Sequence, residues 1–511
     1  MGRYKRNGFA LAAQEEEITG STDHQKRLAR PSLDSQSQSE LQTPEVVIET
    51  GTLRRSITLF GAVAILIANI GGTGIFITPT MILRFSGSPG LSILIWMLGG
   101  IVQAAYAFCT VEIALMFNKA GGPYFFIYSS FGDIAGFVYM WGFVIFIVGP
   151  SWALGSYTAS LYTLSVFFTD CQPSDFLVKL VALWLMITLM AINSTYMKVT
   201  TSIQSFLTSC KMIALVIIIV SGLILVPSET GQENLSSFMD GSTTNIGNIA
   251  LGLFAGSYGF GGWQVITVLA EEVKDPVRNI PRSLGFVFVL LILVMTATNF
   301  AYYVVLSKTE ALKSEAVAML FGQMIHPWIP VIMSVLVSLC AIGTLNVLIM
   351  GQPRVLFAAG RNGHMPRIMT MLHRTYNTPW PATWTLGLVA SFLLLTGSVM
   401  SLVAAISLYF GSSAILLTVS IFVLRWKHPD KHRPFRIPTV IPILVFIVMT
   451  TIVTMSIYEK PLTLVSNLIT ILLGVPIYLV FFKCKAVRKR LHFMDRIGYF
   501  LERSFLLQYE T

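Results

Sequence analysis

Charged side chains are scarce in this sequence. Asp, Glu, Lys and Arg make up only 12% of its 511 residues, whereas hydrophobic residues make up 54%. A soluble protein of this length needs far more charge to cover its surface, so the composition excludes a soluble fold. Short segments of alternating apolar and polar residues are also missing, and this absence argues against a membrane β-barrel.

Long unbroken apolar runs take the place of charge, and each is long enough to cross about 30 Å of hydrocarbon as a helix. The twelve predicted spans are 59–83, 91–117, 134–165, 176–193, 203–226, 247–270, 284–306, 328–358, 384–400, 402–424, 438–457 and 462–482. We therefore predict an all-α membrane protein embedded in the lipid bilayer. Its expected parts are an N-terminal tail (1–52), two five-helix groups (53–226 and 247–424), helices eleven and twelve (438–482) and a C-terminal tail (483–511).

A signal peptide is missing as well, because the first 50 residues are polar and have no apolar core. This segment contains the acidic run Glu15-Glu16-Glu17 and a stretch rich in Ser and Gln at 32–39. Such a composition is typical of disorder. We expect the first membrane helix itself to direct insertion.

Positive charge is distributed unevenly between alternate loops. With a cytosolic N-terminus, the loops around Arg278, Arg361 and Arg425 are all cytosolic, whereas the 227–246 loop, which has no Lys or Arg, lies outside. The positive-inside rule therefore places both termini in the cytosol. These loops also explain the net charge of +10, so we predict no nucleic-acid partner. Asn234-Leu235-Ser236, in the outside loop, could be a used or an unused glycosylation site.

Cysteine is rare, and clusters of metal ligands are not found. Cys109, Cys210, Cys340 and Cys484 lie in apolar runs or at a cytosolic end, where packing in the core explains them. Cys171 falls in a predicted outside loop, where it could be a free thiol or, because the outside is oxidising, part of an intermolecular disulfide. We predict no metal, no cofactor and no catalytic residue.

Glycine clusters interrupt two of the predicted helices. Gly71, Gly72 and Gly74 fall in the first span, and four glycines fall between Gly256 and Gly262 in the sixth. Each costs about 1 kcal/mol relative to Ala inside a helix. Close helix packing is one explanation, but packing motifs space small residues four apart. If spans one to five and six to ten are repeats, the clusters occupy corresponding positions, which favours a transporter binding site.

Backbone that leaves the helix at membrane depth must be buried in protein or line a wet cavity. Freed N–H groups near Thr73 and Gly74 suit a carboxylate, and freed carbonyls near Ile70, Tyr258 and Gly259 suit an ammonium group. A zwitterionic α-amino acid carries both groups. The predicted substrate-binding residues are Ile70, Gly72, Thr73, Gly74, Tyr258, Gly259 and Gly261.

Several short glycine- and proline-containing motifs follow one another along the chain. They are Gly72-Thr73-Gly74-Ile75-Phe76, Gly87-Ser88-Pro89-Gly90, Gly121-Gly122-Pro123-Tyr124, Gly261-Gly262-Trp263 with Glu271-Glu272 and Pro276-Val277-Arg278-Asn279-Ile280-Pro281, and Gly360-Arg361-Asn362-Gly363-His364-Met365-Pro366. Over about residues 50–485 the chain resembles the light-chain subunits of heteromeric amino-acid transporters. These form the L-type group of the amino acid–polyamine–organocation superfamily.

The resemblance implies a leucine-transporter-like fold, a 5+5 inverted repeat whose first and sixth helices are unwound. It implies sodium-independent amino-acid exchange by alternating access at the plasma membrane. Tyr258 matches the aromatic gate of the sixth span. Lys211 matches a lysine of this family that occupies the region where sodium binds in sodium-coupled relatives, although it could instead snorkel to an interface. Cys171 matches the cysteine that bonds a single-span type II glycoprotein heavy chain.

The sequence departs from the family at several positions. Gly71 stands where Ile is usual, Gly149 where many members have Arg, and Phe410 where Asn is frequent. Gly261 and Gln264 stand where members that carry cations can have Asp. Because no acid lines the sixth-span break, we predict neutral substrates, large or aromatic. The predicted side-chain pocket consists of Gln264, Phe410 and Val148.

Other functions remain open at this point. A proton-coupled permease for polyamines or cationic amino acids is the main alternative within transporters. A channel is the alternative from another class, but channels need a ring of equivalent residues and a continuous wet path. An enzyme is disfavoured, since the intramembrane charges are isolated. Glu112 is expected to pair with a cytosolic basic group.

Overall fold

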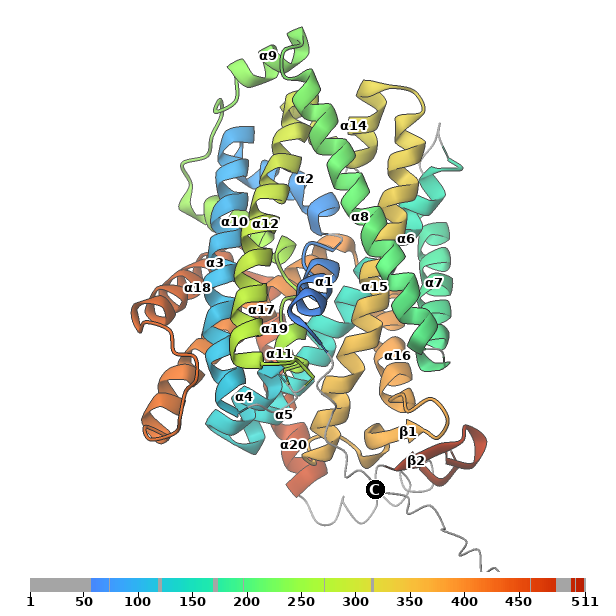
Figure 1. Ribbon diagram of the computed structural model, residues 1–511, viewed down its shortest axis with the longest axis vertical. Helices are drawn as coiled ribbons and strands as arrows, with labels where there is room; N and C mark the ends of the chain where they lie inside the picture. The colour runs from blue at the N-terminus through green and yellow to red at the C-terminus, as the bar shows by residue number, and fades with distance from the viewer. Residues whose placement is uncertain are drawn as a thin grey trace, which may run out of the picture. The chain divides into compact units, whose positions relative to one another are not determined.

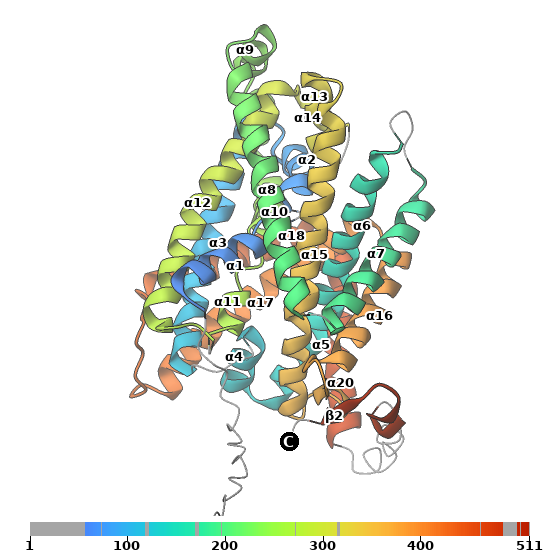
Figure 2. The ribbon, with the colours of Figure 1, turned by 45° about the vertical axis from the view of Figure 1, so that its right-hand side comes forward.

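The computed structural model describes residues 57–72, 74–117, 122–168, 173–195, 197–270, 272–313, 317–459, 461–483, 498–500 and 502–509. All of them belong to one compact unit, Leu53–Thr511, and helices dominate it (Figure 1 and Figure 2). Seven helices in these ranges are long and apolar enough to cross a membrane. They are α3 (Pro89–Phe117), the rod Asp133–Ser165, α7 (Asp175–Thr195), the Phe206–Leu225 part of α8 (Met197–Leu225), α12 (Pro276–Val305), α15 (Ile329–Arg361) and the Ser401–Lys427 part of α17 (Val399–Lys427).

Shorter apolar helices lie within four further predicted spans, the first, ninth, eleventh and twelfth. These are α1 (Leu59–Asn69), α16 (Trp380–Thr396), α18 (Val440–Glu459) and the last span, which consists of α19 (Pro461–Leu472), α20 (Gly474–Tyr478) and the π-helix η3 (Leu479–Lys483). Together with the long helices they confirm an all-α, multi-pass membrane protein.

Both glycine-rich spans are interrupted. In the first, α1 ends at Asn69 and α2 (Gly74–Ser86) begins five residues later. In the sixth, α10 (Ile246–Gly259) is followed by a turn and the short helix α11 (Val265–Val268). The interruptions fall at the predicted glycine clusters.

The third span contains a feature that apolar patterning does not predict. Between α5 (Asp133–Gly142) and α6 (Gly149–Ser165) lies a π-helix, η1 (Phe143–Val148). Such segments widen the helix locally and are frequent at functional sites.

Short elements also occupy segments that we treated as loops or tail. They are α4 (Gly122–Phe131), α9 (Glu229–Ser236), α13 (Lys308–Ala311), α14 (Val317–Ile325), the 3₁₀-helix η2 (Arg367–Thr370), β1 (Met371–His373) and β2 (Leu507–Tyr509). β1 and β2 pair antiparallel, with Leu372 opposite Gln508. These elements were missed because none has a membrane-length apolar run. Figure 1 and Figure 2 place α9 and α14 at one end of the bundle and α4, β1 and β2 at the other.

A buried ion pair ties α3 to α17. The guanidinium of Arg425 donates to both carboxylate oxygens of Glu112, Nε at 2.9 Å and Nη2 at 2.7 Å. The backbone N–H of Ile437, just before α18, donates to the same carboxylate at 3.0 Å. Arg425 is thus the basic partner that we predicted for Glu112, and the pairing offsets the cost of burying a carboxylate.

Around the two interruptions the helices pack closely. α1 lies against α8, α12 and α15, whereas α10 lies against α2, α3, α17 and α18. α6 packs along α15 and also contacts α17. The interrupted segments therefore lie inside the bundle, where their backbone is shielded from lipid.

Candidate substrate-binding site

The two interruptions touch each other through backbone atoms. A Cβ built on Gly74 would lie 2.9 Å from the Cα of Gly259, which is closer than real Cβ contacts. A Cβ on Gly262 would lie 2.6 Å from the carbonyl oxygen of Asn69, and Gly262 has a φ of +104°, which L-residues rarely adopt. Only glycine fits these positions, so the clusters permit the first and second interruptions to meet.

A cavity of about 230 Å³ lies at this junction. Six of the predicted site residues line it: Gly72, Gly74, Tyr258, Gly261, Gln264 and Phe410. Ile70, Gly259 and Val148 are buried but do not line the cavity. Thr73 lies outside the described residues.

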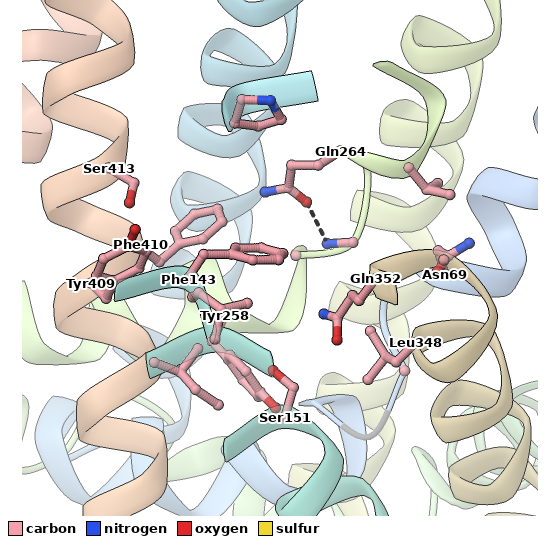
Figure 3. Close-up of a pocket in the computed structure, with 18 of the residues that line it drawn as sticks. Asn69, Phe143, Ser151, Tyr258, Gln264, Leu348, Gln352, Tyr409, Phe410 and Ser413 are labelled. Carbon is pink, nitrogen blue, oxygen red and sulfur yellow. Dashed lines mark hydrogen bonds between the residues drawn. The ribbon is translucent and has the colours of Figure 1, made fainter. Parts of the chain in front are cut away.

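The cavity walls come from helices far apart in the sequence. Tyr409, Phe410 and Ser413 of α17 line one side, and Leu348 and Gln352 of α15 line the other, with Tyr258 and Phe143 between them (Figure 3). Sequence reasoning missed the lining residues on α3, α6, η1 and α15. These helices carry no glycine cluster to mark them, and they become neighbours only in the fold.

Aromatic rings form a continuous wall at the α3 side of the cavity. The Tyr106 ring meets Trp263 edge to face at a centroid distance of 5.1 Å and Phe410 at 5.8 Å. Nε1 of Trp263 donates to Oε1 of Gln103 at 3.1 Å. Phe410 therefore occupies the predicted side-chain pocket as part of a packed aromatic group.

Gln264 stabilises the second interruption. Its Oε1 accepts the backbone N–H of Gly262 at 3.1 Å, the bond drawn as a dashed line in Figure 3. Its backbone carbonyl accepts the Thr267 hydroxyl at 2.7 Å. Gln264 thus holds the turn between α10 and α11 in addition to lining the cavity.

Lys211 reaches the end of α1. Its Nζ donates to the carbonyl oxygens of Ile67 and Ile70, both at 2.8 Å, and the residue is only 2% exposed. The last carbonyls of a helix carry partial negative charge, so an ammonium group suits them. The burial excludes snorkelling. It also means that the Ile70 carbonyl, which we predicted as a ligand of the substrate's ammonium, already accepts a hydrogen bond from Lys211.

The end of α10 offers further carbonyl oxygens. The Ser257 carbonyl accepts the N–H of Phe260 at 3.2 Å, and the Tyr258 carbonyl accepts the N–H of Gly261 at 3.0 Å. Each carbonyl has a second lone pair, so these bonds do not exhaust its capacity. The Tyr258 side chain packs against the apolar cluster that includes Leu402, Val403 and Ile406.

Polar groups surround the other end of the cavity. Tyr124 of α4 lines it, and the Tyr124 hydroxyl lies 2.5 Å from Nδ1 of His364. Nε2 of His364 lies 3.4 Å from Asp133, and burial lowers the pKa of His364 although Asp133 opposes that shift. Arg354, also in the lining, pairs with Glu272 at 3.7 Å.

The remaining predicted site residues lie elsewhere. Cys171 is outside the described residues. Asn234 lies in α9, where its side-chain amide donates to the Val304 carbonyl at 3.0 Å, and its glycosylation stays a prediction. Cys109, Cys210 and Cys340 are buried free thiols. Within the described ranges, no three His, Cys, Asp or Glu side chains are grouped to hold a metal ion.

A cavity between two interrupted helices, inside a bundle of membrane-length helices, is typical of a membrane transporter of small solutes. Residues 57–482 match the amino acid permease family, and the chain belongs to this family. It is 32% identical over 441 residues to the mouse Asc-type amino acid transporter 1, covering 86% of this chain and 83% of the relative.

Two further relatives have nearly the same sequence identity to this chain. The mouse large neutral amino acids transporter small subunit 2 is 31% identical over 448 residues, covering 85% of this chain and 83% of the relative. The human cystine/glutamate transporter is 31% identical over 430 residues, covering 84% and 85%. These matches confirm the resemblance drawn from the motifs. The protein is an amino-acid transporter and not an enzyme.

Proposed function

We propose that the protein is a sodium-independent exchanger of neutral amino acids at the plasma membrane, working by alternating access. The observation that carries the proposal is the backbone contact between the two interruptions beside one cavity. The first N–H groups of α2, from Gly74 onward, have no partner within their own helix and suit a carboxylate. Carbonyls at the end of α10 suit the ammonium group, and Tyr258 acts as the gate over the substrate.

Twelve spans in a 5+5 inverted repeat, with two additional C-terminal helices, are part of the same proposal. We infer that both tails, 1–52 and 483–511, are cytosolic. The support is the distribution of Lys and Arg among the loops, together with the interruptions in the first and sixth predicted spans.

Sodium independence follows from Lys211. Its ammonium group lies against two carbonyl oxygens at the end of α1, and oxygen atoms of this kind are the ligands that a sodium ion would use. A fixed positive charge there replaces the ion. Coupling to sodium is then not needed to stabilise the interruption.

The preference for neutral substrates rests on the charges around the cavity. Among the described lining residues there is no Asp or Glu, so a cationic side chain finds no direct counter-charge. Arg354 is the charged residue in the lining, and its pairing with Glu272 reduces its attraction for an acidic side chain. Neutral amino acids, large or aromatic, therefore fit better than the cationic alternative.

The chain is further proposed to be the light chain of a heterodimer, joined through Cys171 to a single-span type II glycoprotein heavy chain. The family motifs and the name of one relative, a transporter small subunit, support this proposal. The predicted outside position of Cys171 is compatible with disulfide formation.

Uptake of labelled leucine, measured with and without unlabelled amino acids on the opposite side of the membrane, tests whether the protein is an exchanger. We expect leucine uptake to accelerate when neutral amino acids are present on the opposite side, and to be equal in sodium and choline media at pH 5.5 and 7.5. Arginine uptake should be small, because the cavity lining offers a cation no acid. Uptake of arginine without leucine contradicts the substrate class, and single-channel currents in reconstituted bilayers would support a channel instead.

Cys171→Ser tests the heavy-chain link. Non-reducing electrophoresis of cells that co-express a heavy chain should show a band near the summed mass for the wild type, and the variant should lose it. Cys109→Ser is the matched control, because Cys109 is buried in α3 and should leave the band unchanged. If the band persists in Cys171→Ser, Cys171 does not form the link between the two chains, and the proposed disulfide is wrong.

A further inference from the structure

Three buried polar atoms in the cavity wall have no hydrogen-bond partner among the described residues. They are Nε2 of Gln103, Oγ of Ser257 and Oγ of Ser407, on α3, α10 and α17. The three residues are 0%, 4% and 5% exposed, and all three line the same cavity. Buried polar groups in folded proteins are almost always paired, so unpaired ones in a cavity wall indicate a ligand that completes them.

We propose that Gln103, Ser257 and Ser407 form a polar subsite for the substrate side chain, which selects neutral amino acids with a hydroxyl or carboxamide over hydrocarbon isosteres. This inference rests on the proposed function and specifies its substrate class.

The two serines differ from other hydroxyl residues of the same bundle. On α17, the hydroxyls of Ser412, Thr418 and Ser420 each donate to the carbonyl four residues earlier, at 2.7–2.9 Å. Back-bonding of this kind is how Ser and Thr usually satisfy themselves inside a helix. Ser257 and Ser407 lack that bond, so their hydroxyls keep both donor and acceptor capacity for the cavity.

Gln103 is held in one orientation by its neighbour. Because Nε1 of Trp263 donates to Oε1 of Gln103 at 3.1 Å, the carbonyl end of the amide is used and the NH₂ end is left as a donor. The amide is therefore pre-oriented before the substrate binds, which reduces the entropy lost on forming the new bond.

The chemistry of the set determines what fits. Two hydroxyls that donate or accept, and one amide that donates, match a side chain that both accepts and donates, as a hydroxyl or a carboxamide does. The aromatic rings of Tyr106 and Phe410, which contact each other, line the same cavity. A hydrocarbon side chain, such as that of leucine, would cover the three polar atoms without bonding them, so isosteres that lack the polar group bind more weakly.

Competition between isosteric amino acids is the direct test. With labelled leucine as the exchanged substrate, unlabelled threonine should inhibit at a concentration about tenfold lower than valine, and asparagine at one about tenfold lower than its near-isostere leucine, the ratio that one net hydrogen bond supports. The comparison uses the wild-type protein, so it does not depend on any variant folding.

Substitutions of the three residues test whether they cause the difference in inhibition between the members of each pair. Ser257→Ala, Ser407→Ala and Gln103→Met should each reduce the threonine-to-valine or asparagine-to-leucine ratio toward one, a readout that is independent of expression level. Ser412→Ala, whose hydroxyl is already bonded to Leu408 and which does not line the cavity, should leave both ratios unchanged.

Equal inhibition by both members of each pair, or ratios that no variant changes, overturns the subsite while leaving amino-acid exchange intact. Failure of the proposed function looks different, because then no amino acid drives exchange of labelled leucine.

Discussion

Replacing Lys211 with methionine is expected to reduce exchange by more than tenfold at equal surface expression. Methionine has a similar length but no donor, so the carbonyls of Ile67 and Ile70 lose a charged hydrogen-bond partner inside the bundle. A hydrogen bond from a charged group contributes about 1.5–3 kcal/mol, and the end of α1 then lacks the group that holds it. The measurement is the initial rate of amino-acid counter-flow, normalised to surface protein.

A smaller replacement at Lys211 separates a general packing defect from loss of the positive charge. Lys211→Ser opens space beside the two carbonyl oxygens, and the residual exchange is expected to rise when sodium replaces choline, because sodium is a hard cation that prefers oxygen ligands. Lys179→Met is the control. Its ammonium pairs with Asp175 at 2.9 Å near the surface, and such pairs contribute little. Exchange at the wild-type rate in Lys211→Met would contradict the role assigned to this lysine.

Gly262→Ala is expected to abolish exchange. At a φ of +104° any L-residue is strained, and the added methyl group would lie 2.6 Å from the carbonyl oxygen of Asn69. Neither the turn nor the end of α1 can move independently, since Gln264 holds the turn and Lys211 holds α1. The two interruptions must therefore separate, which moves the proposed backbone ligands of the substrate apart. Counter-flow per surface molecule measures the loss.

Gly285→Ala is the matched control for that substitution. Gly285 lies in α12, where a new Cβ would meet only Phe108, at an ordinary contact distance of 3.6 Å. Alanine is favoured over glycine in a helix by about 1 kcal/mol, so this variant should transport normally and unfold at a temperature no lower than the wild type. Normal exchange by Gly262→Ala would show that the backbone contact is not required.

Part of the site could be read directly from composition. Clustered glycines are costly in helices, so Gly72 and Gly74, with Gly259 to Gly262, indicated where the helices are interrupted. A buried charge needs a partner, so Glu112 indicated a basic contact, although Arg425 is 313 residues away along the chain. Such features are local or follow from a single residue's chemistry.

Other assignments depended on facts that only contacts provide. Ile70 was predicted as a substrate ligand from its place beside the first interruption, and only the structure shows that its carbonyl also accepts a hydrogen bond from Lys211, 141 residues away along the chain. Val148 was itself a predicted pocket residue, yet it is buried and does not line the cavity.

The sequence by itself determined that this chain is a membrane transporter with two interrupted helices, because hydropathy, charge bias and glycine clustering are properties of short segments. Only the tertiary structure decided which side chains surround the cavity. Gln103, Ser257, Ser407 and Gln352 come from four different helices, and each helix has several faces that its own sequence makes almost equally apolar. Packing of α3, α10, α15 and α17 selects which face turns to the cavity, and that selection is a property of the whole bundle.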